Sequence, residues 1–226
     1  MHKHNMTKQD NMPQVARYWN DIAAEFDSIY TGKDKSPISR KMDRVFRKDM
    51  YQRYEWVMRK TGDVKGLKIC DVGCGSGRFV TALAKKGAEH VTGVDVAPEM
   101  LKLAREVVAQ DGTEDRCDFA LSDVLNWKTD EKYDISIAIG FWDYIMDPPE
   151  RLRLIRKFTT KQFLSAWPRF WTWRMPVRKV RLQYIRGCPV YFFRKPTVVE
   201  MIEEAGFKVE SCERIGKLFC VDARAV

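Results

Sequence analysis

Apolar residues near the start of the chain recur at helical spacing. They predict an amphipathic helix over 13–30, whose apolar face holds Val15, Tyr18, Trp19, Ile22 and Phe26. A second pattern of the same kind predicts a helix over 38–58, and the polar stretch "TGKDKSP" predicts a turn between the two. We therefore expect residues 1–62 to form an N-terminal helical cap that belongs to the same domain as the rest of the chain.

From residue 63 onward, short apolar runs alternate with helical patterns. The runs predict strands at 67–72, 90–95, 117–122, 133–139, 162–167, 207–215 and 217–223, and the patterns between them predict helices at 77–86, 98–110, 148–158 and 196–205. Strands separated by single helices are typical of an α/β fold with a doubly wound parallel sheet. Because no helix separates the last two strands, one edge strand should be antiparallel.

Length and composition narrow the class of protein. With 226 residues and 45% hydrophobic content, the chain suits one globular domain. No apolar run reaches the roughly 18 residues of a membrane span, and the polar start lacks a signal-peptide core, so we expect a soluble cytoplasmic protein. The six cysteines form neither a CxxC pair nor a cluster with histidine, which predicts reduced thiols and no metal.

The positive charge of the chain is concentrated in one segment. Net charge is +9, yet residues 151–199 hold thirteen Lys and Arg and no Asp or Glu, so the remainder has 40 − 13 = 27 basic against 31 acidic residues. Within that segment, "PRFWTWRMPVRKVRLQYIRG" mixes arginines with aromatics. An anionic small molecule, a membrane surface, nucleic acid or simply a solvated basic face would each account for it.

Acidic residues end three of the predicted strands. Asp71 precedes the glycines of "DVGCGSG", Asp95 ends the strand of "VTGVDVAPEML", and Asp123 follows the strand of "ALSDV". The glycine spacing departs from the GxGxxG dinucleotide fingerprint. A carboxylate at the end of the second strand can accept both hydroxyls of a ribose. Three acids with no Lys or Arg for a phosphate suit a cationic nucleoside.

These three segments resemble the class I S-adenosylmethionine-dependent methyltransferases, and the resemblance spans residues 63–226. It implies the sheet order 3-2-1-4-5-7-6 with strand 7 antiparallel, a Rossmann-like methyltransferase fold, and S-adenosylmethionine as cofactor with S-adenosylhomocysteine as product. It assigns the methionine part to the first motif, the ribose to Asp95, and the adenine to Asp123 and Val124. The full cofactor-binding set predicted is Asp71, Gly73, Cys74, Gly75, Gly77, Asp95, Val96, Met100, Ser122, Asp123, Val124 and Ile139.

The motif "DPPE" at 147–150 resembles the DPPY signature of amino-methylating enzymes of nucleic acids but does not directly follow the fourth strand. The motif is typical of a helix start, which disfavours amino-methylation of nucleic acid.

The three histidines are not expected to take part in catalysis. His2 and His4 lie in the N-terminal tail, and His90 begins a strand at the end opposite the cofactor. The candidates for orienting or deprotonating an acceptor are Tyr18, Tyr30, Asp143 and Tyr144.

The basic aromatic segment 168–194 follows the fifth strand and is predicted to form a lid over the acceptor. Substrate contacts are expected from Trp142, Trp171, Trp173, Arg174, Arg178 and Tyr184. The layout of cap, insertion and closing strands resembles the magnesium-protoporphyrin O-methyltransferases, which implies O-methylation of a carboxylate; where that subfamily has a histidine after strand four, Tyr144 stands here.

Three functions remain open from the sequence. The first is O-methylation of a small anionic or aromatic molecule. The second is methylation of a lipid or lipid-linked substrate, with 168–194 docking transiently on an anionic membrane. The third, ranked last, is an RNA methyltransferase or RNA-binding module. The sequence does not predict an oligomeric state.

Overall fold

The computed structural model describes residues 11–23, 48–170 and 187–226. A seven-stranded sheet has the order β3-β2-β1-β4-β5-β7-β6. Strand β7 is antiparallel to both β5 and β6, and the other pairings are parallel. The predicted fold class, strand order and antiparallel strand are confirmed. The strands are β1 Lys68–Val72, β2 His90–Asp95, β3 Cys117–Leu121, β4 Tyr133–Ile139, β5 Thr159–Pro168, β6 Phe207–Ile215 and β7 Leu218–Ala225.

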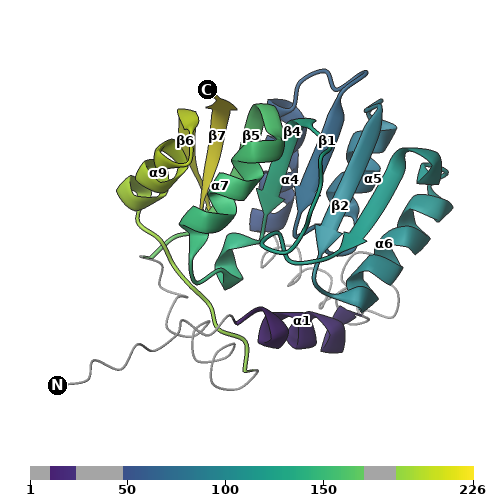
Figure 1. Cartoon of the computed structure of the whole chain (residues 1–226), viewed down its shortest axis with the longest axis horizontal. Coiled ribbons are helices and arrows are strands. Elements are labelled where there is room, and N and C mark those ends of the chain that lie inside the picture. The colour runs from purple at the N-terminus through teal and green to yellow at the C-terminus, as the bar shows by residue number, and fades with distance from the viewer. Residues whose placement is uncertain (1–10, 24–47, 171–186) are drawn as a thin grey trace.

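Helices cover both faces of this sheet. They are α1 Met12–Asp21, α4 Lys48–Lys60, α5 Arg78–Lys85, α6 Pro98–Gln110, α7 Pro148–Phe158 and α9 Lys195–Glu204, with short 3-10 helices η1 Glu114–Arg116 and η2 Trp142–Tyr144. Figure 1 shows α7 and α9 in front of the sheet, with α4 and α5 behind it. A strand buried on both faces reads as a continuous apolar run, which is why β1 and β4 were recognisable without alternation.

Two apolar clusters fill the space between the helices and the sheet. On the α4–α5 side, Trp56 and Val57 of α4 pack with Ile137 of β4 and Leu164 of β5. On the α7–α9 side, the cluster includes an aromatic stack in which the rings of Trp142 and Trp167 are 4.2 Å apart and nearly parallel at 8°. The side chains buried in both clusters fix the sheet between its helices and hold the strand ends in place.

The two predicted N-terminal helices are described only in part. Helix α1 ends at Asp21, and α4 begins at Lys48, so the parts of the two predicted helices in 24–47 lie outside the described residues. Helix α1 contacts α6 and lies along the lower edge of the sheet in Figure 1, beyond the carboxyl ends of the parallel strands. Helix α4 instead packs on the sheet itself, and the division into a cap (1–62) and a methyltransferase domain (63–226) stays a prediction.

Candidate active site

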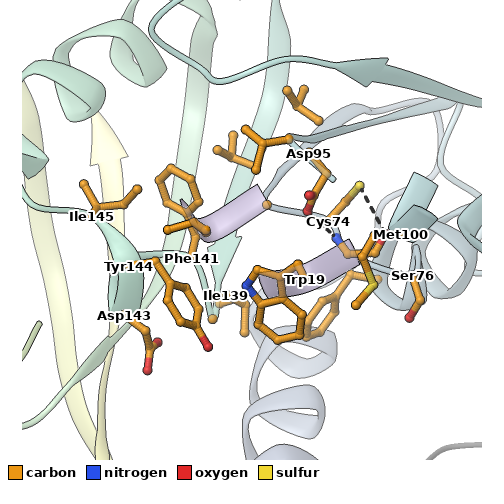
Figure 2. A pocket seen from close by; sticks show the side chains of 18 of the residues that line it. Trp19, Cys74, Ser76, Asp95, Met100, Ile139, Phe141, Asp143, Tyr144 and Ile145 are labelled. Atoms are coloured by element: carbon orange, nitrogen blue, oxygen red, sulfur yellow. Dashed lines mark hydrogen bonds between the residues drawn. The ribbon is translucent and has the colours of Figure 1, made fainter. Parts of the chain in front are cut away.

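A cavity of about 320 Å³ opens at the carboxyl ends of the parallel strands. Its wall is built by α1, α4, the glycine-rich turn after β1, the residues that follow β2, β3 and β4, and the start of β7. Figure 2 shows side chains from these segments pointing toward one another, with Trp19 of α1 among them. Its volume falls in the range of small-molecule sites, and the carboxyl edge is where doubly wound sheets bind ligands.

The turn after β1 is held tightly against its neighbours. The backbone N–H groups of Gly73 and Cys74 both donate to the carbonyl of Val94, at 2.7 and 3.1 Å. Gly73 has a φ of +73°, and a Cβ there would lie 2.8 Å from Cδ2 of Phe141. Gly77 has a φ of +72° directly before α5. Gly73 and Gly77 therefore have to be glycine for two reasons: their backbone is in the left-handed region, and a side chain would collide with its neighbours.

Asp95 is fixed at the end of β2 by two backbone donors. Its Oδ2 accepts from the N–H of Gly75 and its Oδ1 from the N–H of Ala97, each at 2.9 Å. Burial raises the pKa of this carboxyl, while those two hydrogen bonds act in the opposite direction. The carboxylate lies in the cavity wall, and the two hydrogen bonds fix its orientation. Its remaining lone pairs are available to a ligand.

Asp71 is buried beside the same turn with an unsatisfied oxygen. Its residue is 1% exposed, and its Oδ2 has no hydrogen-bond partner among the described residues. Burial, and then the nearby charge of Asp95, raise the pKa of Asp71 to about 8. Two carboxyl groups so placed, one of them without a partner, make a site that favours a cationic ligand.

The carboxylate of Asp123 is not free, which corrects the sequence interpretation. Nη2 of Arg151 lies 2.7 Å from Oδ2 of Asp123, and Nε of Arg151 donates to Oδ1 at 3.4 Å. Both side chains are almost completely buried. The expectation that no Lys or Arg stands beside these acids is therefore wrong for Asp123. Asp123 still lines the cavity.

A signal for Arg151 is present in the sequence. The buried positions of α7 are Pro148, Arg151, Leu152, Ile155 and Phe158, so Arg151 falls on the apolar stripe of the helix. A charged residue on such a stripe is buried only when it is paired. Which acid pairs with it depends on how α7 lies on the sheet.

Ten of the twelve predicted cofactor residues line the cavity: Gly73, Cys74, Gly75, Asp95, Val96, Met100, Ser122, Asp123, Val124 and Ile139. Asp71 and Gly77 lie behind this wall. Gly77 packs instead against α6, since a Cβ added to it would lie 2.9 Å from Cβ of Ala104. Burial raises the pKa of the Cys74 thiol well above its ordinary value, so this cysteine is an apolar wall residue rather than a nucleophile.

Some of the residues predicted to contact the acceptor line the cavity, and others are buried in the core. Asp143 and Tyr144 line the cavity, and the ring of Tyr144 meets the ring of Trp19 edge to face at 5.6 Å. Tyr18 packs against Trp19 at 5.4 Å but does not reach the wall. Trp142 is 0% exposed and stacks in the core, which differs from the expected substrate contact. Figure 2 shows Asp143 and Tyr144 across the cavity from Asp95 and Met100.

The predicted lid is described only at its two ends. Tyr30, Trp171, Trp173, Arg174, Arg178 and Tyr184 lie outside the described residues. At the near end, Phe170 donates through its N–H to the carbonyl of Phe193 at 3.0 Å. At the far end, the N–H of Tyr191 donates to the carbonyl of Asp143 at 2.8 Å. The two ends of the segment are thus bonded to each other, and the far end is also bonded to Asp143 after β4.

Several wall residues were not predicted. They include Met12, Val15 and Trp19 of α1, Arg53 and Tyr54 of α4, Arg78 at the start of α5, Phe141 after β4, and Lys217 in the β6–β7 turn. The sequence showed the helical spacing of Val15 and Trp19, but it did not show which surface these residues face.

The remaining histidine in the described residues, His90, contacts Asp118 at 3.0 Å. No group of three His, Cys, Asp or Glu suited to a metal occurs within 11–23, 48–170 and 187–226, and none of the helices described there is long and apolar enough to cross a membrane.

The fold and the cavity define a doubly wound α/β protein with a ligand site at the carboxyl edge of its sheet. Residues 63–172 match the family model described as a methyltransferase domain. In structure, the chain is similar to the magnesium protoporphyrin IX methyltransferase of Synechocystis PCC 6803 with bound S-adenosylhomocysteine, with a TM-score of 0.76 and 17% identity over 96% of this chain and 100% of that one. Residues 63–172 are therefore similar to a methyltransferase domain, and the chain shares the fold of that enzyme, which confirms the resemblance seen in the motifs.

Curated relatives give the same class. The ubiquinone biosynthesis O-methyltransferase of Aeromonas salmonicida is 27% identical over 150 residues, which cover 66% of this chain and 56% of the relative. The protein of the same name from Bordetella avium is 32% identical over 103 residues, which cover 45% of this chain and 42% of the relative. The chain thus spans about half the length of these relatives.

Proposed function

We propose that this chain transfers a methyl group from S-adenosylmethionine to an oxygen of a small anionic or aromatic molecule. The observation that carries the proposal is the fixed carboxylate of Asp95 in the cavity wall, held by the N–H groups of Gly75 and Ala97. A carboxylate so placed at the end of the second strand suits a ribose diol. The names of the curated relatives support oxygen as the atom methylated.

The remaining wall residues fit this cofactor. Asp71 lies behind the wall, and its carboxyl, with an unpartnered Oδ2 and Asp95 nearby, would favour the positively charged methionine part of the ligand. Val96, Met100 and Val124 supply apolar contacts for the adenosine part. Because the carboxylate of Asp123 is neutralised by Arg151, it would contribute to adenine binding as a positioned wall residue rather than as a free acid.

Bound S-adenosylmethionine supplies an electrophilic methyl group on a positively charged sulfur. The chain has to place an acceptor oxygen in line with that group and to keep water out. Trp19, Phe141 and Tyr144 form an apolar and aromatic wall suited to a flat acceptor. Asp143 and Tyr144 are the candidates for orienting an acceptor hydroxyl or taking its proton. An acceptor that is already anionic would need no such base.

Binding of S-adenosylhomocysteine by calorimetry tests the cofactor assignment. Asp95→Ala should weaken binding by about a hundredfold or more, because two charge-assisted hydrogen bonds to the ribose are lost. Asp130→Ala removes an exposed carboxylate that makes no hydrogen bond to a described residue, and it should bind as the wild type does. Equal affinity in Asp95→Ala would refute the site.

Transfer of a labelled methyl group into extract of the source organism tests the acceptor class. The extract is separated into metabolite, lipid, nucleic-acid and protein fractions after reaction. We expect label in the metabolite fraction, and its loss on mild alkaline hydrolysis would identify a methyl ester. Label confined to lipid or RNA would instead favour docking through segment 168–194 and contradict the small-molecule proposal.

A further inference from the structure

The cavity wall carries charged residues of both signs. Its carboxyl groups are Asp95 at the end of β2, Asp123 after β3 and Asp143 after β4, and Asp71 of β1 lies behind the wall near Asp95. Its cations are Arg53 from α4, Arg78 from the start of α5, and Lys217 from the β6–β7 turn. A cationic cofactor bound at Asp95 would leave Arg53 for the acceptor.

Arg53 lies against the segment that follows β4. A Cβ built on Gly140 would lie 3.4 Å from Nη1 and 3.8 Å from Nη2 of Arg53, so the guanidinium rests against the backbone just before Phe141. Gly140 has a φ of +83°, which suits a residue without a side chain. The charge of Arg53 also lowers the pKa of the Cys220 thiol of β7, against the stronger effect of burial, which raises it to about 12. The guanidinium therefore lies on the β4–β7 side of the cavity.

Arg53 also differs from the other arginines of the site in its contacts. Arg78 is stacked over the ring of Tyr54, with 4.9 Å between its guanidinium carbon and the ring centroid. Arg151 is paired with Asp123. Arg53 makes no hydrogen bond or ion pair with any residue in 11–23, 48–170 or 187–226. A half-buried guanidinium in a cavity wall that lacks an anionic partner is suited to bind an anion that enters the cavity.

We infer that Arg53 binds a carboxylate group of the acceptor and makes this site select anionic aromatic molecules. The inference deepens the proposed function and rests on it, because it assumes that the cofactor occupies the Asp71–Asp95 side. A planar guanidinium binds a carboxylate through two parallel hydrogen bonds, and this fixes the orientation of the attached ring as well as its position. The aromatic wall of Trp19 and Tyr144 would receive that ring.

The test compares naphthoate with naphthylmethanol, which has the same rings but no charge. Binding of each is measured by ligand-observed NMR on the full chain saturated with S-adenosylhomocysteine. We expect the wild type to bind naphthoate roughly tenfold to a hundredfold more tightly than the alcohol. Arg53→Gln should remove this preference, and Arg53→Lys should restore part of it, since a lysine keeps the charge but loses the planar fork.

Arg59→Gln is the matched control on the same helix. Arg59 is 67% exposed and lies 3.6 Å from Glu213, away from the cavity wall, so this variant changes net charge equally and should keep the preference. The affinity for S-adenosylhomocysteine is measured first in every protein. If the wild type does not bind it, the proposed function fails. If it binds normally but naphthoate has no advantage, or if Arg53→Gln keeps the advantage, only the role of Arg53 is overturned. A large loss of cofactor affinity in Arg53→Gln would place Arg53 on the cofactor and overturn the inference as well.

Discussion

Replacing Asp71 by asparagine should stabilise the ligand-free protein and weaken cofactor binding at the same time. The carboxyl of Asp71 is buried, has one unsatisfied oxygen and has a pKa raised to about 8 from its ordinary 3.8. At pH 7 it must therefore take up a proton on folding. Those roughly 3 pH units between 3.8 and 7 correspond to at most about 4 kcal/mol. Asparagine has nearly the same shape and needs no proton.

The sign of the pH dependence follows from the direction of this shift. Between about pH 4 and pH 8 the folded state holds a proton on Asp71 that the unfolded state has lost, so the free energy of unfolding of the wild type falls as pH rises through that window. It is unaffected by this group below pH 4 and levels off above pH 8. Asp71→Asn should lack this component and have an unfolding free energy higher by roughly 1–4 kcal/mol at pH 7.

Urea denaturation followed by tryptophan fluorescence at several pH values measures this effect. Asp130→Asn, the same chemical change at an exposed position, is the control and should follow the wild type. Calorimetry in buffers of different ionisation enthalpy adds a second measurement: the wild type should release a proton when S-adenosylmethionine binds at pH 7, and Asp71→Asn should not. A variant that is less stable than the wild type at pH 7, or one that keeps the full pH dependence between 4 and 8, would refute the reasoning.

Two further predictions concern the packing that holds the site. Gly73→Ala should destabilise the fold and weaken cofactor binding, because the φ of Gly73 is +73° and the new Cβ would lie 2.8 Å from Phe141. Gly112→Ala is the control for backbone strain alone, because Gly112 has a φ of +65° and open space around it. This control should lower the unfolding free energy by only about 1 kcal/mol. Arg151→Met should lower the unfolding free energy by about 3–5 kcal/mol, because it leaves the buried carboxylate of Asp123 unpaired. Adding Asp123→Asn should recover most of that loss in urea denaturation, and a double variant no more stable than the single one would contradict the ion-pair explanation.

The local patterns of the sequence were enough to predict the elements of the sheet. Runs such as 133–139 and 207–215 match their strands residue for residue, and helices 98–110 and 148–158 match theirs. Periodicity and helix-start residues are local signals, and each is read within one element. The positions of Asp95 and the glycine-rich turn at strand ends followed in the same way, since the end of a strand is itself a local feature.

What the sequence determined by itself was therefore the order of elements, the class of fold and the motif residues at the carboxyl edge of the sheet. Tertiary structure alone decided which side chains meet there: that Arg151 neutralises Asp123, that Trp142 stacks in the core while Tyr144 reaches the cavity, and that Arg53 lies against Gly140. Each of these contacts joins elements far apart in the chain. Their geometry depends on how a helix lies on the sheet, which is set by packing of the whole core rather than by any short stretch of sequence.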